Sequence, residues 1–425
     1  MAQASTLSRE RFGLLFTVML VAAAGNTAMQ SLMPSIGRAL RIPDLWIAVA
    51  FSLSAVIWVV TAPHWARRAD HRGRRALMRL GLYGFIISMA ICGAVLAAGL
   101  SGVLAPMVVF VVFIFGRAIY GTFGSASPPA VQAYIAARTE GEERTRYLSA
   151  LASSFGLGTI IGPAIAPLFI FHPLGLSGPL VVFAAIGTAV LAFLILRLPD
   201  DTPRLNVRGR VADYPSIGGP GASASQEQAA EPTPLRWRDP RVVGWHMIGV
   251  IGGHGQAAML GVIGFLIIDR LGLPPSQAQH SIAIVLMAGA AASLLAQWGL
   301  IPYLALSPRQ LVIWGLAASA VGTVWTGLAP DMYGMTLGFS LASLGFGFFR
   351  PGFTSGASLA VDPSEQNAVA GMVTSVNGVA YIAAPALGVW LYGMWMPLPF
   401  LLTGALLVGL GAWVLFAFSP SDPAA

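Results

Sequence analysis

The chain has 425 residues, of which 56% are hydrophobic and only 10% are charged. Soluble domains carry about 25% charged residues, so this composition excludes a water-exposed globular protein and predicts one embedded in a lipid bilayer. The net charge of +7 comes from arginine alone, in short loops beside apolar runs, which favours membrane orientation over nucleic-acid binding.

The apolar runs predict an all-α integral membrane protein with twelve transmembrane helices. Crossing a ~30 Å hydrocarbon core takes about 20 residues. The first run continues past the alanines at 22–24, so we interpret it as a membrane helix rather than a cleaved signal peptide. In chain order, the predicted spans lie near residues 12–34, 45–65, 78–99, 104–136, 147–171, 178–198, 241–268, 277–301, 310–329, 332–361, 366–393 and 398–418.

A polar segment divides these spans into two sets of six. Its Gly-, Ser- and Ala-rich middle is typical of a flexible linker. We therefore predict an N-terminal six-helix bundle at 1–198, a cytoplasmic linker loop at 199–240 and a C-terminal six-helix bundle at 241–425. Glu143 and Glu365 each precede a proline at the same separation, which indicates that the halves are repeats of one another.

The arginines predict the orientation. With the N-terminus inside, the inner loops hold 19 arginines and the outer loops three. The positive-inside rule then places both termini in the cytoplasm of a multi-pass protein of the inner (plasma) membrane.

Three short motifs stand on or beside these spans. The loop after the second span carries Asp-x-x-Gly-Arg-Arg, the fourth span carries Arg-x-x-x-Gly and the fifth carries Gly-x-x-x-Gly-Pro. The Gly-x-x-x-Gly spacing favours close helix packing, and proline bends a helix. The residues are Asp70, Gly73, Arg74 and Arg75; Arg117 and Gly121; and Gly158, Gly162 and Pro163.

With these motifs and twelve spans, the whole chain resembles the major facilitator superfamily, and within it the twelve-span drug and metabolite:proton antiporters. The resemblance implies two pseudo-symmetric bundles and a cytoplasmic gate in which Asp70 contacts the start of span eleven near Asn367. The alternative is that Asp70 only neutralises neighbouring arginines. The chain departs from the family pattern at Ala66, where the first motif opens with glycine, and at Ala166 and Pro167, where the third closes with a glycine pair.

Arg117 and Arg350 are the two arginines that remain after the loop arginines are counted. Both fall inside spans, where each costs about 2.5–3.5 kcal/mol unless it meets water or a partner. The resemblance implies that spans one, four, seven and ten line a central cavity. No acidic residue is central in a span, so the predicted cargo is neutral or anionic. The alternative is that both arginines bind backbone carbonyls or polar neighbours. The candidate cavity residues are Asn26, Gln30, Arg117, Tyr120, His254, Gln256, Phe346 and Arg350.

We therefore expect a monomeric secondary transporter of small amphipathic molecules that works by alternating access, and the resemblance implies that it exports them and is driven by protons. The candidate proton carrier is His254, because histidine titrates in the useful range. Asp269, beside Arg270, is another candidate, although we favour a surface ion pair for it. Alternatives are an organic-anion importer or facilitator on the same fold, and a non-transporting receptor or scaffold. The residues form no enzyme constellation, metal-ligand group or phosphate loop, so we expect no catalytic activity, metal or cofactor.

Overall fold

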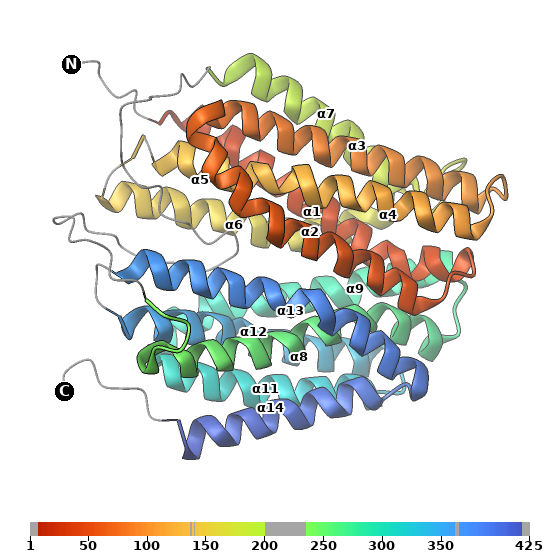
Figure 1. Ribbon diagram of the computed structural model, residues 1–425. Coiled ribbons are helices and arrows are strands. Elements are labelled where there is room, and N and C mark those ends of the chain that lie inside the picture. The colour runs from red at the N-terminus through yellow and green to blue at the C-terminus, as the bar shows by residue number, and fades with distance from the viewer. Residues whose placement is uncertain (1–6, 137, 140, 200–234, 362–364, 419–425) are drawn as a thin grey trace. The chain divides into compact units, whose positions relative to one another are not determined.

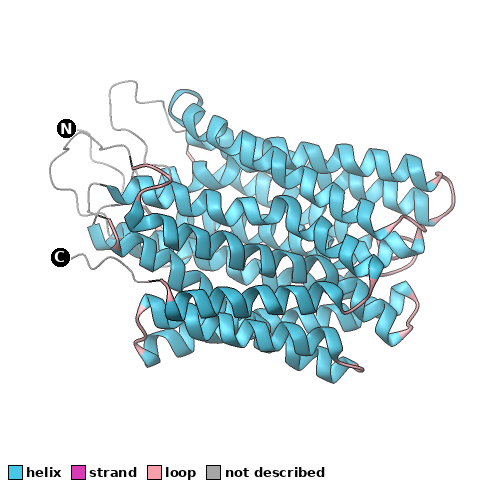
Figure 2. Cartoon of the chain, turned by 60° about the horizontal axis from the view of Figure 1, so that its bottom comes forward, coloured by secondary structure: helices cyan, strands magenta, loops and turns pink. Residues whose placement is uncertain are grey.

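The computed structural model describes residues 7–136, 138–139, 141–199, 235–361 and 365–418. Within these ranges the regular secondary structure consists of helices joined by short loops, as Figure 2 shows. The first half contains α1 (Arg9–Ala39), α2 (Asp44–Arg72), α3 (Arg74–Leu100), α4 (Pro106–Phe123), η1 (Gly124–Ala126), α5 (Ser127–Ala136), α6 (Gly141–Ile165), η2 (Ala166–Phe169) and α7 (Gly178–Arg197). The second half contains α8 (Pro240–Leu271), α9 (Pro275–Leu294), η3 (Leu295–Leu300), α10 (Ile301–Leu304), α11 (Pro308–Leu328), α12 (Met332–Leu359), α13 (Gln366–Met394) and α14 (Leu398–Phe416).

Each predicted span corresponds to one helix or to consecutive helical segments. Span four consists of α4, η1 and α5, because Pro128 and Pro129 cannot donate to the carbonyls of the preceding turn. The chain tightens there into a 3₁₀ turn over Gly124–Ala126. Spans five and eight are likewise composite, as α6 with η2 and as α9 with η3 and α10.

The helices fit a protein that crosses a membrane many times. Among the described residues, 11 helices are long and apolar enough to span a bilayer. Leu157–Phe169, in the place of span five, forms a shorter apolar helix. The protein is therefore an all-α, multi-pass membrane protein.

The chain divides into two compact units. The first unit comprises Met1–Gln30 and Leu53–Gln226, and the second comprises Ser31–Ser52 and Glu227–Ala425. Helices α1 and α2 therefore each contribute to both units, and their connection belongs with the second. The division into bundles at residues 198 and 241 stays a prediction.

Within each unit the helices pack along their length. In the first unit α3 packs against α4, α5 and α7, which run beside it in Figure 1. In the second unit α8 packs against α13, and α12 packs against both α9 and α11. The close approach of α11 to α12 depends on glycine, because a Cβ added at Gly322 would meet the Ala342 backbone nitrogen.

Candidate functional site

Arg117 lies in the interior of the first unit. Its side chain is 3% exposed, and its Nη1 donates to Asn26 Oδ1 of α1 over 3.1 Å. The Met29 sulfur lies 3.8 Å from the same nitrogen, and the guanidinium carbon lies 5.2 Å from the centroid of the Tyr120 ring. The structure thus brings together three predicted cavity residues, Asn26, Arg117 and Tyr120, and encloses the guanidinium.

Arg350 occupies a different environment in the second unit. It is half-buried on α12, and its Nη2 donates to Asn377 Oδ1 of α13 over 3.3 Å. Asn377 is itself buried, so α13 holds the amide in place beside the guanidinium. Here too the partner of the charge is a neutral amide.

An aromatic stack lies beside Arg350 along α12. Phe346 and Phe349 have ring centroids 6.4 Å apart, and Phe349 and Phe353 have centroids 5.3 Å apart. Phe346 is 1% exposed, because the stack packs within the second unit. A glycine on α8, Gly252, lies directly against Phe349 and lets the ring approach the backbone.

The remaining predicted cavity residues lie apart from these contacts. His254 and Gln256 are half-buried on α8, and Gln30 is exposed on α1. His254 Nδ1 lies 2.7 Å from the Val250 carbonyl oxygen. Because a carbonyl can only accept, Nδ1 carries the hydrogen, and Nε2 is the acceptor of the neutral ring.

The motif between α2 and α3 is described in part. Gly73 has φ 83°, a left-handed conformation that glycine adopts without strain and that turns the chain from α2 into α3. Arg75 then donates to the Ile195 carbonyl of α7, and Arg74 is half-buried at the start of α3. The side chains of Asp70 and Asn367 lie outside the described residues, so the predicted gate contact stays a prediction.

The motif on α6 lies against α1. A Cβ on Gly162 would meet the Ala24 carbonyl oxygen, and a Cβ on Gly158 would lie 2.7 Å from Ala23 Cβ. Thr27 Oγ1 donates to the Gly158 carbonyl over 3.3 Å. Pro163 is buried within α6, directly after this contact. The two glycines therefore allow α6 and α1 to pack backbone to backbone.

A charged cluster at the α1–α2 connection was missed by the sequence interpretation. Within the second unit, Arg38 donates to both Asp44 oxygens, over 2.7 and 2.6 Å, and to Asp269 Oδ2 over 2.9 Å. The Tyr392 hydroxyl donates to the same Asp269 oxygen over 2.7 Å. Asp269 thus pairs with Arg38 rather than with its neighbour Arg270, because consecutive helical residues point in different directions.

A buried amide extends these contacts along α1. Gln279 of α9 is 0% exposed and donates to Ser31 Oγ over 3.3 Å, while it accepts from Ser35 Oγ over 3.3 Å. Arg270, by contrast, donates to the Gly327 carbonyl of α11 over 2.9 Å. The α1–α2 connection is therefore fastened to α8, α9 and α13 by polar groups.

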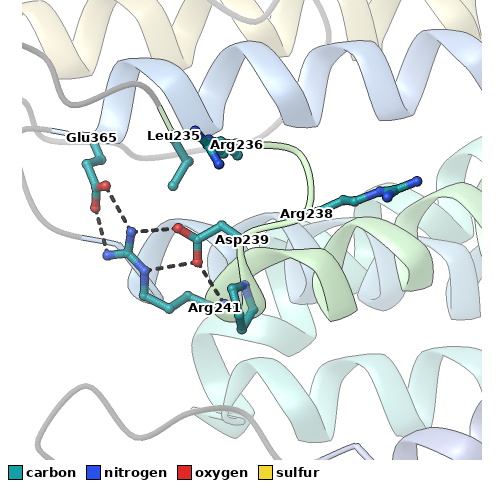
Figure 3. A pocket seen from close by; sticks show the side chains of 7 residues that line it. Leu235, Arg236, Arg238, Asp239, Arg241 and Glu365 are labelled. Carbon is teal, nitrogen blue, oxygen red and sulfur yellow. Dashed lines mark hydrogen bonds and ion pairs between the residues drawn. The ribbon is translucent and has the colours of Figure 1, made fainter.

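A second charged cluster ties the beginnings of α8 and α13. Figure 3 shows Arg241 between Asp239 and Glu365, and its guanidinium donates to Glu365 over 2.8 and 2.9 Å and to Asp239 over 3.1 and 2.9 Å. These hydrogen bonds hold the pKa of Asp239 below its usual value. Leu235, Arg236, Arg238 and Pro240 line the rest of a recess of about 430 Å³.

The sequence did contain a signal for some of the contacts that its interpretation missed, namely polar residues within apolar helices. Asn377 interrupts the apolar run of α13, and its pairing with Arg350 requires knowledge of which faces of α12 and α13 meet. The partners of Asp269, Arg38 and Tyr392, come from α1 and α13, which are far apart in the sequence. Among the described residues, no group of three or more His, Cys, Asp or Glu side chains could hold a metal ion.

Apolar spanning helices arranged in two helical units define a polytopic membrane protein. The family model described as Major Facilitator Superfamily matches residues 15–305. The chain belongs to the major facilitator superfamily and is a membrane transporter, not an enzyme.

Several transporters are similar to this chain at low identity. The chain is 24% identical over 420 residues to multidrug resistance protein 2 of Bacillus subtilis, covering 97% of each chain. It is 27% identical to the staphyloferrin B transporter of Staphylococcus aureus over 46% of this chain and 44% of that one. It is 31% identical to the class E tetracycline resistance protein of Escherichia coli over 35% and 32% of the two chains.

Solved structures of the same fold cover nearly the whole chain. The human organic anion transporter MFSD10 has a TM-score of 0.63 at 16% identity, covering 96% of this chain and all of that one. A bacterial homologue of the lysosomal transporter Spinster has a TM-score of 0.71 at 12% identity, covering 96% of this chain and 98% of that one. These similarities show the fold, which agrees with the predicted fold class.

Proposed function

We propose that this protein is a secondary exporter of small amphipathic molecules, neutral or anionic, that works by alternating access in the bacterial inner membrane. The observation that carries the proposal is the match to multidrug resistance protein 2, which extends over 97% of both chains. The names of shorter matches, among them tetracycline resistance proteins, point the same way. The neutral partners of Arg117 and Arg350 support a cargo without a positive charge.

The close contact between α6 and α1 supports export in particular. Resemblance to antiporters gave Gly158, Gly162 and Pro163 as an antiporter-like motif, and these glycines lie against the α1 backbone. A tight contact between α6 and α1, one of the helices expected to line the cavity, limits leakage of ions through the transporter, which an antiporter needs. The missing glycine pair at Ala166 and Pro167 favours the second candidate, an organic-anion importer on the same fold.

Proton coupling is the second part of the proposal, with His254 as the group that binds the proton. Its Nδ1–H is engaged with a carbonyl, which leaves Nε2 as the ring nitrogen that can accept a proton. The predicted spans contain no central carboxylate that could serve instead. His280, exposed on α9, offers a matched control histidine.

The test is transport by the full chain in liposomes with an imposed pH gradient and a panel of anionic, neutral and cationic solutes. We expect the gradient to drive neutral or anionic solutes out against their own gradient, and His254→Gln to abolish the drive while His280→Gln retains it. Accumulation only in the uptake direction would support the importer. Proton flux that persists in His254→Gln would remove His254 as the carrier.

A further inference from the structure

The two membrane-embedded arginines differ in how far their guanidinium groups are open to a further partner. Arg117 is enclosed, with contacts to the Asn26 amide, the Met29 sulfur and the Tyr120 ring. Arg350 is half-buried, and its hydrogen bond to Asn377 is, at 3.3 Å, near the long limit for such bonds. A guanidinium carries five N–H donors, so one long bond to a single amide oxygen leaves most of its donor capacity for another partner.

The charge of Arg350 is not balanced by its partner. An asparagine amide is neutral, so the Arg350–Asn377 pair keeps a full positive charge. In the described part of the second unit, the nearest acidic residues along α12 and α13 are Asp331 and Glu365, at the beginnings of these helices. Asp331 accepts from Gly334 N, and Glu365 accepts from Arg241. A positive charge inside a membrane span without a carboxylate beside it is costly and typical of a functional position.

The chemistry of Arg350 suits an anionic ligand. Phe346, Phe349 and Phe353 of the same helix are each at most 1% exposed, so they form a packed apolar wall beside Arg350 and leave the half-buried guanidinium as the polar group that a ligand can meet. A planar guanidinium binds carboxylate and sulfonate oxygens in two parallel hydrogen bonds, a geometry that one amide oxygen cannot match. An anionic group would therefore bind the guanidinium more strongly than the Asn377 amide does, and would displace that amide.

We propose that Arg350 is the residue that recognises an anionic headgroup on the cargo, and that Asn377 is the residue that positions its guanidinium. This proposal rests on the proposed transport function and commits it to anionic cargo. Arg117 has a structural task, because its charge is enclosed by Asn26, Met29 and Tyr120. The sequence alone suggests the same role for both arginines, whereas their contacts distinguish a recognition role for Arg350 from a structural role for Arg117.

The experiment measures charge preference with two probes of nearly equal shape, naphthalene-2-sulfonate and the neutral naphthalene-2-sulfonamide. Binding of each to the purified full chain is measured by equilibrium dialysis, and transport of each by the reconstituted protein. We expect the wild-type chain to bind the sulfonate at least about tenfold more tightly, as an added charged hydrogen bond implies.

Three variants assign the preference to Arg350. Arg350→Gln removes the charge and is expected to abolish the preference, whereas Arg350→Lys keeps the charge and is expected to retain part of it. Asn377→Asp places a carboxylate beside Arg350 with almost no change of shape, and is expected to abolish the preference as well. Gln310→Glu adds the same charge at the exposed start of α11, where a capping glutamate is tolerated, and is the matched control.

The outcomes separate this proposal from the proposed function. A wild-type chain that binds both probes equally, or a preference that survives in Arg350→Gln, overturns the assignment even if other solutes are exported. Loss of the preference in Gln310→Glu also overturns it, because the effect would then be long-range charge. Failure to move any solute of the panel contradicts the transport function itself.

Discussion

At the scale of single residues, the two glycines of α6 do more than permit helix packing in general. Gly162 is positioned so that even one methyl group would press on the Ala24 carbonyl and the Thr27 hydroxyl. Backbone atoms cannot move aside as side chains can, so the contact has little tolerance. The spacing of the motif in sequence predicted close approach, and the identity of the partner helix required the structure.

We expect Gly162→Ala to lower the stability of the protein by about 1–3 kcal/mol, the usual cost of overpacking. Gly13→Ala in α1 is the matched control, because nothing lies within 4 Å of a Cβ added at Gly13. Thermal unfolding of both variants in detergent provides the measurement. Equal midpoints for the two variants would show that the α6–α1 contact is looser than described.

The residues of the candidate site were predictable in type but not in pairing. An arginine inside an apolar run is visible in sequence, and so is its need for a partner. Asn26 was identified because it falls in the first span near the predicted cavity, whereas Asn377 was not. Which polar groups meet depends on the rotation of each helix about its axis, and the low amphipathicity of membrane helices leaves that rotation undetermined by sequence.

At the scale of elements, charged groups fasten the connection between α1 and α2. A single side chain, Arg38, donates to two carboxylates, Asp44 and Asp269, and the Tyr392 hydroxyl donates to the second. Asp44 begins α2, where a negative charge is favourable, and Asp269 lies near the end of α8, where it is not. The link from Asp269 is therefore the one that most needs the charge of Arg38.

We expect Asp269→Asn to loosen the α1–α2 connection. The reporter is a cysteine introduced by Ala48→Cys in a Cys92→Ala background, since Ala48 is 6% exposed and Cys92 is the single native cysteine. Loss of about 1 kcal/mol of hydrogen bonding would raise the rate of thiol labelling about fivefold. Asp331→Asn, which keeps an N-cap on α12, should leave the rate unchanged. If Asp269→Asn left the labelling rate of the introduced cysteine unchanged as well, Asp269 would not fasten the α1–α2 connection.

The elements themselves were predictable to a large extent. Hydropathy predicts long spans well, because a bilayer demands about 20 apolar residues whatever the tertiary contacts are. The interruptions in spans four and eight were not predicted. Tandem prolines explain the first, and the π-turn Leu295–Leu300 lies in an unremarkable apolar run.

At the scale of the whole molecule, orientation in the membrane is a prediction that rests on arginine counts. We expect Ser101→Cys to react with a membrane-impermeant thiol reagent in intact cells, and Gln310→Cys to react only after lysis, both in the Cys92→Ala background. Both positions are exposed, and the positive-inside rule places them on opposite sides. The reverse labelling pattern would show that the protein has the opposite topology in the membrane.

The shared membership of α1 and α2 also bears on how the chain could be divided. Residues 31–52 come from the first half of the sequence, yet they pack with helices of the second half. A fragment ending in the 200–234 segment would carry with it a hairpin that binds the other fragment through the Arg38–Asp269 and Ser31–Gln279 hydrogen bonds. Two separately synthesised fragments would thus be held together by noncovalent contacts. The peptide that links them in the intact chain would not be the only connection between them.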